Sequence, residues 1–154
     1  MFIIEDTGQK VHQHDIKNND FVNMGISVIR NKLPFGDYAL PPKVAVDTKK
    51  NMEEIAGNIC GARTEHTRFK NECIKARDAG CKLYFLIEND VGITSIDEVH
   101  NWINPRVIYN QNCVQGERLE KAMKTMRDRY GCEFLFCKPE ESASIVIKLL
   151  TGGE

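Results

Sequence analysis

The chain has no hydrophobic run long enough to cross a membrane. Its longest wholly apolar stretch is Leu83–Ile87, whereas a membrane-spanning helix needs roughly 20 apolar residues. Residues 1–6 carry neither a basic flank nor a long apolar segment, so the features of a secretory signal peptide are missing as well. We therefore expect an intracellular, cytoplasmic protein that does not associate with membranes.

The sequence also lacks the cysteine spacing of a zinc site. None of its six cysteines forms a C-x-x-C pair, and the closest histidine pair, His12 and His14, has no cysteine near it. Structural zinc sites are built from such closely spaced ligands. Because cysteines inside cells are kept reduced, we expect free thiols, most of them packed in the core.

An excess of charge of one sign is missing too, since the net charge is −1. A nearly neutral chain does not coat nucleic acid nonspecifically, but affinity for phosphate depends on local clusters of cations. Two basic clusters are present, and for the second a solvated helix face is an equally good interpretation. The first comprises Arg63, Arg68, Lys70, Lys75 and Arg77, and the second Lys121, Lys124, Arg127 and Arg129.

Hydrophobic periodicity predicts an α/β protein. A chain of 154 residues is of the size of one domain. Alternating or wholly apolar runs predict strands, and apolar residues at helical spacing, bounded by glycine or proline, predict helices. We therefore expect a mixed sheet with helices on both faces. The expected strands cover 2–4, 25–30, 37–40, 44–49, 82–88 and 133–137, and the expected helices 14–24, 52–60, 65–79, 95–102, 119–130 and 139–150.

Two carboxylates and an ammonium group are predicted to meet across an apparent hairpin. Asp37 begins its first strand, and Asp47 and Lys49 end its second. Because side chains alternate along a strand, Asp47 and Lys49 point to one face and Thr48 to the other. Two carboxylates beside an ammonium group suit a divalent cation, a phosphate oxygen and an activated water. The pattern therefore predicts the working part of a metal-dependent nuclease.

Taken singly, the residues of this region have ordinary structural interpretations. Asp37 is a typical turn residue, and Lys49 and Lys50 are typical of a solvated strand end that discourages aggregation. Glu53 lies in a first helical turn, where a carboxylate stabilises the helix dipole. Arg68 has acidic residues at helical spacing, with which it can form a salt bridge. Only the combination of Asp37, Asp47 and Lys49 favours a catalytic interpretation.

With these residues in view, the chain resembles the XPF-type nuclease domain of the restriction-endonuclease-like PD-(D/E)XK superfamily. That family carries V-D-x-R-E, then G-D, then E-R-K-x-x-x-D, a helix beginning R-L or R-F, and a strand ending L-I-E. The ordered set is much more specific than any one motif, and it covers residues 2 to about 89. The matching stretches are Glu5–Gln9, Gly36–Tyr38, Asp47–Lys49 with Glu53, Arg68-Phe69, and Leu86–Glu88.

The resemblance implies a fold and a reaction. The fold would be one nuclease-like domain over 1–154, with a core over about 2–89 and a C-terminal helix-strand-helix extension over about 90–154. The reaction would be the hydrolysis of DNA phosphodiester bonds with Mg²⁺, for which Mn²⁺ can substitute. Because a bound cation lowers the pKa of its water, hydroxide would form near neutral pH.

The resemblance also implies a role for each matched residue. Asp37 and Asp47 would hold the cation, with the carbonyl oxygen of Thr48 as a third ligand, and Asp6 would supply an outer carboxylate. Lys49 would orient the attacking water and stabilise charge on the phosphate. The remaining residues would support the ligands from behind or contact nucleic acid. The supporting residues are Glu53 and Gln9, and the nucleic-acid contacts are Arg68, Lys50 and Arg63.

Departures from the family pattern leave more than one function open. Gly8 and Gln9 stand where the family has arginine and glutamate, so a carboxylate that helps to hold the metal is replaced by an amide. The first hypothesis is an endonuclease that cuts branched or partly single-stranded DNA. The second is a catalytically weak or silent relative that binds DNA or acts as a scaffold for a partner. The third is an unrelated α/β binding protein, for which the matches would be accidental.

Residues 90–154 contain no helix-hairpin-helix repeat, the module with which the family often grips duplex DNA. We therefore expect that grip to come from a second copy of the chain or from a partner protein. Small chains of this kind in the family suggest recombination or repair in a bacterium or a phage.

Overall fold

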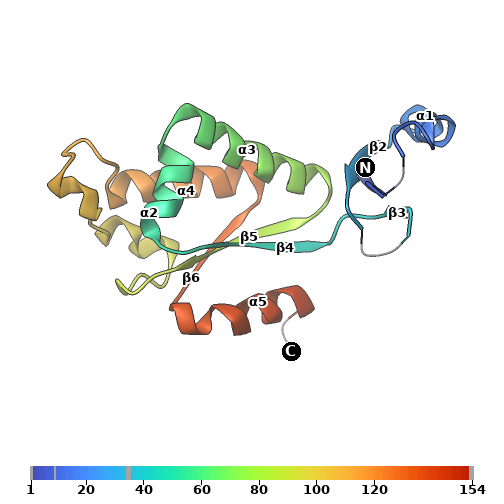
Figure 1. Cartoon of the computed structure of the whole chain (residues 1–154). Helices are drawn as coiled ribbons and strands as arrows, with labels where there is room; N and C mark the ends of the chain where they lie inside the picture. The colour runs from blue at the N-terminus through green and yellow to red at the C-terminus, as the bar shows by residue number, and fades with distance from the viewer. Residues whose placement is uncertain (1, 9, 34–35, 153–154) are drawn as a thin grey trace. The chain divides into compact units, whose positions relative to one another are not determined.

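The computed structural model describes residues 2–8, 10–33 and 36–152, and the chain forms two compact units (Figure 1). The first unit comprises Met1–Lys43 with Asp78–Cys81, and the second comprises Val44–Arg77 with Lys82–Glu154. Within the described ranges, no helix is long and apolar enough to span a bilayer.

The first unit contains a three-stranded sheet in the order β2-β1-β3. Strand β1 (Phe2–Asp6) pairs in parallel with β2 (Ser27–Asn31) and antiparallel with β3 (Tyr38–Ala39). Helix α1 (Asp15–Asn23) connects β1 to β2, and none of its residues is buried. The weakly helical polar segment expected at 14–24 is therefore confirmed as a surface helix.

A buried carboxylate organises the interior of this unit. Glu5 is buried, and Arg30 Nε lies 3.3 Å from its Oε2. Asn18 donates a hydrogen bond of 3.2 Å from Nδ2 to the same oxygen, and the Tyr38 hydroxyl donates one of 3.0 Å to Asn18 Oδ1. A buried charge is tolerated only with such partners, so these contacts tie α1, β2 and β3 to β1.

The second unit is built on a parallel three-stranded sheet in the order β4-β5-β6. Its strands are β4 (Val44–Lys49), β5 (Lys82–Glu88) and β6 (Glu133–Cys137). The central strand β5 carries the longest apolar run of the chain and is mostly buried, as expected for a strand covered on both faces. In the register of the sheet, Asp47 of β4 pairs with Phe85 of β5.

Helices cover both faces of this second sheet. Figure 1 shows α2 (Met52–Cys60), α3 (Arg63–Asp78) and α4 (Gly116–Tyr130) on one face and α5 (Ser142–Thr151) on the other. Helix α4 ends at the left-handed Gly131, with φ of 71°, the C-terminal cap that the sequence predicts.

Aromatic packing joins α3 to the sheet of the second unit. The rings of Phe69 and Phe85 stack with centroids 4.4 Å apart, and Phe134 stacks on Phe85 at 5.4 Å. Strand alternation places Phe85 on the helix-covered face with Leu83 and Ile87, all in one buried core. The apolar stripe predicted for α2 completes that core with Met52, Ile55, Ala56 and Ile59.

The segment expected to form a helix at 95–102 is a short 3-10 helix, η1 (Ile96–Asn101). The Ser95 side chain, in the N-cap position, makes no capping hydrogen bond. The Glu98 carboxylate instead accepts hydrogen bonds of 2.8 Å from the backbone N–H and the hydroxyl of Thr94. Two further 3-10 segments are η2 (Pro105–Ile108) and η3 (Pro139–Glu141).

The α/β class with flanking helices is confirmed, but the predicted hairpin is wrong. Strand β3 pairs with β1, whereas β4 pairs with β5, so the two expected hairpin partners belong to different sheets. The apolar residues of β4 gain more by packing beside the long central strand than beside the two residues of β3. The connection contains Pro41 and Pro42, which cannot donate ladder hydrogen bonds. Pro34 and Phe35, which precede β3, lie outside the described residues.

Candidate active site

Strand β4 places an acid and a base side by side on the face covered by α3. The Lys49 ammonium donates a hydrogen bond of 3.0 Å to Asp47 Oδ2. Only 11% of the Lys49 side chain is exposed, and its Nζ lies 5.7 Å from the centroid of the Phe85 ring. Thr48 between them is exposed, on the opposite face as strand alternation requires. The predicted pairing of Asp47 with Lys49 is therefore confirmed.

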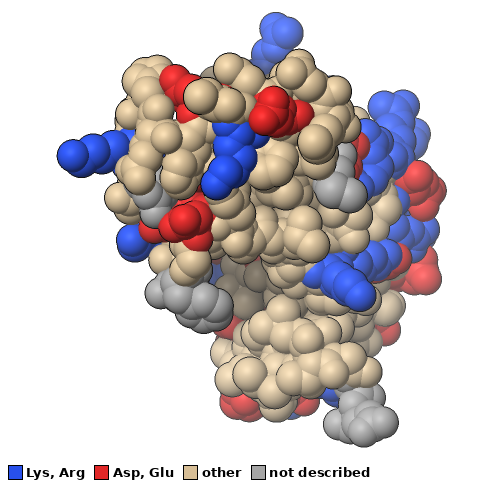
Figure 2. Space-filling model, turned by 90° about the vertical axis from the view of Figure 1, so that its right-hand side faces the viewer, with Lys and Arg blue, Asp and Glu red and all other residues tan. Residues whose placement is uncertain are grey.

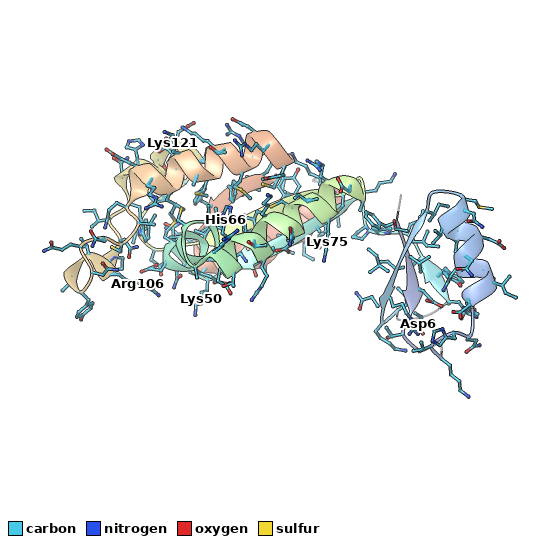
Figure 3. All side chains as sticks on the ribbon, turned by 90° about the horizontal axis from the view of Figure 1, so that it is seen from above. Asp6, Lys50, His66, Lys75, Arg106 and Lys121 are labelled. Atoms are coloured by element: carbon cyan, nitrogen blue, oxygen red, sulfur yellow. The ribbon has the colours of Figure 1, made fainter. Side chains whose placement is uncertain are left out.

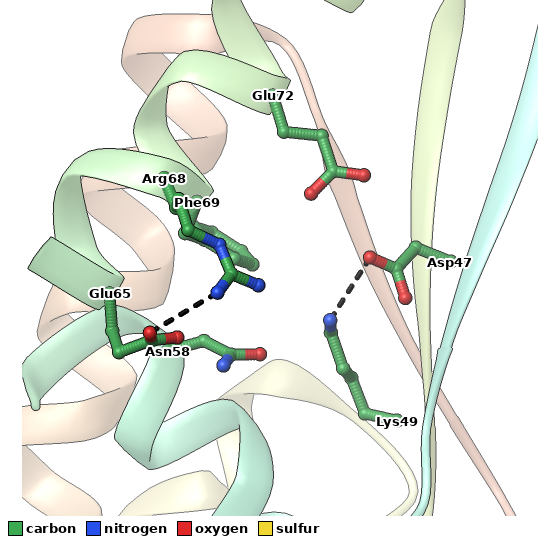
Figure 4. A pocket seen from close by; sticks show the side chains of 7 residues that line it. All are labelled: Asp47, Lys49, Asn58, Glu65, Arg68, Phe69 and Glu72. Carbon is green, nitrogen blue, oxygen red and sulfur yellow. Dashed lines mark hydrogen bonds and ion pairs between the residues drawn. The ribbon is translucent and has the colours of Figure 1, made fainter.

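These two side chains line a cavity of about 320 Å³ between β4 and α3 (Figure 4). The α3 residues that line it recur at i, i+3, i+4 and i+7, which puts them on one face of the helix. Polar groups make up almost all of the lining. The complete lining is Asp47, Lys49, Asn58, Glu65, Arg68, Phe69 and Glu72.

Glu72 brings a second carboxylate to this cavity, and the sequence analysis missed it. Figure 4 shows its side chain pointing from α3 toward Asp47. The pKa of Glu72 is raised, mainly because its carboxyl group is partly removed from water. The charge of Asp47 and a hydrogen bond with Asp47 raise this pKa further, whereas the Lys49 ammonium lowers it. The spacing of Glu72 from Arg68 and Phe69 on α3 is the signal that could have identified it.

Two further groups of the cavity are suited to contact a ligand. Asn58 Oδ1 is buried and has no hydrogen-bond partner among the described residues. Buried acceptors are nearly always satisfied, so an amide oxygen aimed into a polar cavity suits a ligand that donates hydrogen bonds or is a cation. Arg68 lies at the exposed rim, with its Nη1 3.3 Å from Glu65 Oε1.

The donor set is compatible with a divalent cation. Carboxylate and amide oxygens are the ligands that Mg²⁺ takes in proteins, and Asp47, Glu72 and Asn58 supply three such groups to one cavity. Within the described ranges, no cluster of three acidic, histidine or cysteine side chains suits a metal. The protein would therefore contribute few carboxylates, as is common for Mg²⁺, which keeps several of its waters.

Asp6, expected as an outer carboxylate, belongs to the first unit and is firmly held there. It is buried, and its Oδ1 accepts a hydrogen bond of 2.9 Å from the Leu33 backbone N–H. The backbone N–H groups of Leu33 and Gly8, followed by the nearby Lys32 ammonium, hold the pKa of this carboxyl below its usual value. Asp6 is thus ionised and fixed by the local backbone.

Gly8, one of the departures from the family pattern, lies against Asp6. A Cβ atom at Gly8 would lie 2.5 Å from Asp6 Oδ2 and 3.1 Å from Lys32 Nζ. Contacts of 2.5 Å require movement, and the Asp6 carboxylate is held by hydrogen bonds that such movement would break. Gln9, predicted as a supporting residue, lies outside the described residues.

Asp37 also belongs to the first unit, where it is exposed and its backbone carbonyl accepts a hydrogen bond of 2.8 Å from Asp6 N–H. The hairpin that was expected to bring Asp37 to Asp47 is not formed. The predicted meeting of these two carboxylates therefore stays a prediction, as does the role of the Thr48 carbonyl.

The other expected site residues lie at separate places in the second unit. Glu53 lines a different cavity of about 260 Å³, together with Arg106 and Arg118. Lys50 is exposed at the start of α2, where its backbone N–H donates to Glu54 Oε2 at 2.9 Å. Arg63 is exposed at the first position of α3. Of this group, only Arg68 borders the cavity of Asp47 and Lys49.

Comparison with known proteins identifies a family. No curated protein matches the chain. The solved structures that resemble it include XPF from Aeropyrum pernix and the same protein in complex with DNA. Each is 14% identical, with a TM-score of 0.49, and the match covers 97% of this chain and 63% of theirs. This chain thus spans less than two thirds of their length.

A family model described as the ERCC4 domain matches residues 6–149, well beyond the stretch ending near residue 89 that the motifs cover. The ERCC4 family is a nuclease family of the restriction-endonuclease-like superfamily. Because the match includes most of the chain, the protein belongs to the ERCC4 domain family.

Proposed function

We propose that this protein is a DNA endonuclease that hydrolyses phosphodiester bonds with the help of Mg²⁺ or Mn²⁺. The observation that carries the proposal is the half-buried Asp47–Lys49 pair, which faces the Glu72 carboxylate across a polar cavity. Membership of a nuclease family supports the same reaction. Two carboxylates and an ammonium group around one cavity are groups that such hydrolysis would use.

Asp47 and Glu72 would hold the cation, with Asn58 Oδ1 as a neutral ligand. When bound, the cation supplies hydroxide at neutral pH by lowering the pKa of its water. Lys49 donates to Asp47 and so is held with its ammonium group directed into the cavity. From that position it stabilises the negative charge that grows on the phosphate oxygens during attack.

Arg68 would position the DNA backbone at the rim of the cavity. Its guanidinium is exposed and shares one contact with Glu65, so further N–H donors remain for a phosphate. Guanidinium groups bind phosphate oxygens in a bidentate manner. The substrate would be branched or partly single-stranded DNA in recombination or repair, gripped together with a second copy of the chain or a partner.

The proposal is tested by incubating the purified protein with labelled flap, fork, four-way-junction and duplex DNAs, with and without Mg²⁺. We expect cutting of a branched DNA that requires the cation and is lost in Asp47→Ala. Lys75→Ala is the matched control, because Lys75 is exposed on α3 and does not line the cavity. Equal cutting by the wild type and Asp47→Ala would end the catalytic proposal.

A catalytically weak DNA-binding protein is the second candidate. It is favoured by the close approach of Gly8 to Asp6, because the arginine of the family pattern would fit there only if the Asp6 carboxylate moved. Thermal unfolding with increasing Mg²⁺ separates the two candidates, because a ligand that binds the folded state raises Tm. An active site predicts a rise in Tm that disappears in Asp47→Ala, whereas the second candidate predicts no change in either protein.

A further inference from the structure

A second cavity lies between α3 and α4, and it is lined by cations. Figure 3 shows the two helices side by side, with the labelled His66 on α3 and Lys121 on α4. The cavity has a volume of about 320 Å³, and we call it the basic groove. Its lining is Ile59, His66, Lys70, Arg118, Lys121, Ala122, Thr125, Met126, Arg129 and Tyr130.

The basic groove and the cavity of Asp47 lie on different faces of α3. His66 and Lys70 line the groove, whereas Glu65, Arg68 and Glu72 line the other cavity. With 3.6 residues per turn, the two sets are roughly 130° apart around the helix axis. A ligand in the groove would therefore be distinct from the phosphate at the proposed catalytic cavity.

The cations of the groove are not neutralised by the protein. In the part of the chain that the structure describes, none of Lys70, Arg118, Lys121 and Arg129 forms an ion pair, and no carboxylate lines the groove. Figure 2 shows Lys and Arg side chains interspersed with Asp and Glu. A concave site whose charged side chains are all cations favours an anionic ligand.

The second basic cluster of the sequence contains two cations that are paired with acids and two that line the groove. Lys124 Nζ lies 2.7 Å from Glu120 Oε1, and Arg127 Nε lies 3.2 Å from Asp128 Oδ1, so these two cations are paired with acids. Lys121 and Arg129 are exposed and line the groove. If the cluster were only a solvated helix face, the unpaired cations Lys121 and Arg129 would not be expected to lie together on the side of α4 that borders the groove.

The shape of the groove favours an extended polyanion over a single phosphate. Arg118 and Arg129 are eleven residues apart on α4, which corresponds to roughly 16 Å along the helix axis. One strand of DNA carries a phosphate about every 3.4 Å of helix axis. The cations thus span the length of several nucleotides.

The floor of the groove is suited to unpaired bases. Ile59 and Met126 are buried beneath it, and Ala122 and the half-buried Tyr130 line it. Aromatic and apolar surfaces bind the faces of unpaired bases with little sequence preference. His66 Nδ1 donates to the Ile59 carbonyl oxygen over 2.7 Å, which leaves Nε2 as the ring nitrogen available to a ligand.

We propose that the basic groove binds a single-stranded segment of nucleic acid, with phosphates on the cations and bases on the apolar floor. The proposal deepens the proposed function, because branched substrates carry single-stranded arms, but the binding itself requires no catalysis. The groove would hold one arm while the cavity of Asp47 acts on another part of the same DNA.

The test is fluorescence anisotropy with a labelled oligothymidylate of about 16 nucleotides, in EDTA so that no cutting occurs. The test variant is Lys121→Ala with Arg129→Ala, and the control is Lys75→Ala with Arg127→Ala, which removes the same charge outside the groove. We expect roughly tenfold weaker binding in the test variant. The slope of log K against log salt should fall by about 1.4 for the two lost phosphate contacts. The control should bind within about threefold of the wild type.

Several results would overturn the proposal. Equal losses in the test and control variants would show that only total charge matters. Tighter binding of a duplex, with the same dependence on Lys121 and Arg129, would assign the groove to double-stranded DNA. Displacement of the oligonucleotide by equimolar polyglutamate would assign it to an acidic protein. Because Asp47→Ala should bind normally in EDTA, failure of the groove and failure of the catalytic proposal are distinguishable.

Discussion

The two cavities beside α3 are alike in size but opposite in how their charges are arranged. In the cavity of Asp47, acids and bases face one another, and Lys49 is in direct contact with Asp47. In the basic groove, cations stand without acids. Paired opposite charges fix the positions of reactive groups, whereas unpaired charges of one sign leave binding energy available for a ligand. Under the two proposals, catalysis takes place on one side of α3 and nucleic-acid binding on the other.

The largest effect should follow from removing the Lys49 ammonium group from the cavity of Asp47. Lys49→Ala should lower the rate of cutting of a branched DNA by at least a hundredfold, because one donor to a developing oxyanion contributes about 2.7–4 kcal/mol. Initial rates at saturating DNA measure it. Lys49→Arg keeps the charge and should recover part of the rate, while cutting by Lys49→Ala within threefold of the wild type would contradict the role of the ammonium.

Reversing one charge of the groove should act on binding alone. Lys70→Glu should weaken binding of a labelled single strand by roughly tenfold, since it replaces a phosphate contact with repulsion. Lys75→Glu, which makes the same change on the same helix outside the groove, is the matched control. If both variants lose the same affinity, the groove has no special place in binding.

The ion pairs that Glu120 of α4 forms with Lys124 and His100 should contribute to the stability of the fold and not to binding. The Lys124 ammonium, followed by the His100 ring and backbone N–H, lowers the pKa of Glu120 to about 2, against the opposing effect of its removal from water. A lowered pKa stabilises the fold above the ordinary value of 4.5, and this contribution is lost as pH falls toward 2. Glu120→Gln should therefore cost roughly 1 kcal/mol at pH 7.

Urea unfolding at several pH values measures this contribution, and the difference between Glu120→Gln and the wild type should shrink below pH 4. Lys121→Gln, a charge change on the unpaired face, should leave the free energy of unfolding unchanged. A difference that stays constant down to pH 2.5 would show that the carboxylate is not the stabilising group.

The smallest effect should come from Glu72. The pKa of Glu72 is raised, so the folded state disfavours its charged form. The charged carboxylate therefore lowers the free energy of unfolding at pH values above the folded pKa, and this loss of stability is absent below the ordinary pKa of 4.5. Without a cation, Glu72→Gln should be more stable than the wild type at pH 8 by a few tenths of a kcal/mol, because the exposed side chain is well screened. Thermal unfolding in EDTA should show no difference at pH 4, and a variant less stable at pH 8 would contradict the proximity of the two carboxylates.

Local patterns predicted the second unit well. The apolar run Leu83–Ile87 could only be a buried strand, and the spacing of Met52, Ile55 and Ile59 specified the buried face of α2. The Asp47–Lys49 pair followed from strand alternation alone. Each of these features depends on neighbours within one element, which is the range over which hydrophobic periodicity carries information.

Features that depend on distant segments could not be predicted in the same way. The hairpin was wrong because the short β3 and the longer β4 each pair with a strand remote from the turn. Glu72 was missed because it meets Asp47 only when α3 packs across β4 and β5, and it contributes to neither strand motif. The division of the second basic cluster likewise depends on which side of α4 faces α3.

The close approach of Gly8 to Asp6 makes position 8 difficult to occupy with a larger side chain. A side chain at position 8 meets the Asp6 oxygen at once, so Gly8→Arg alone would disturb the carboxylate before its guanidinium could reach any site. A change near Leu33 or Lys32 that releases Asp6 would have to accompany an arginine at position 8, so the two substitutions should be introduced together.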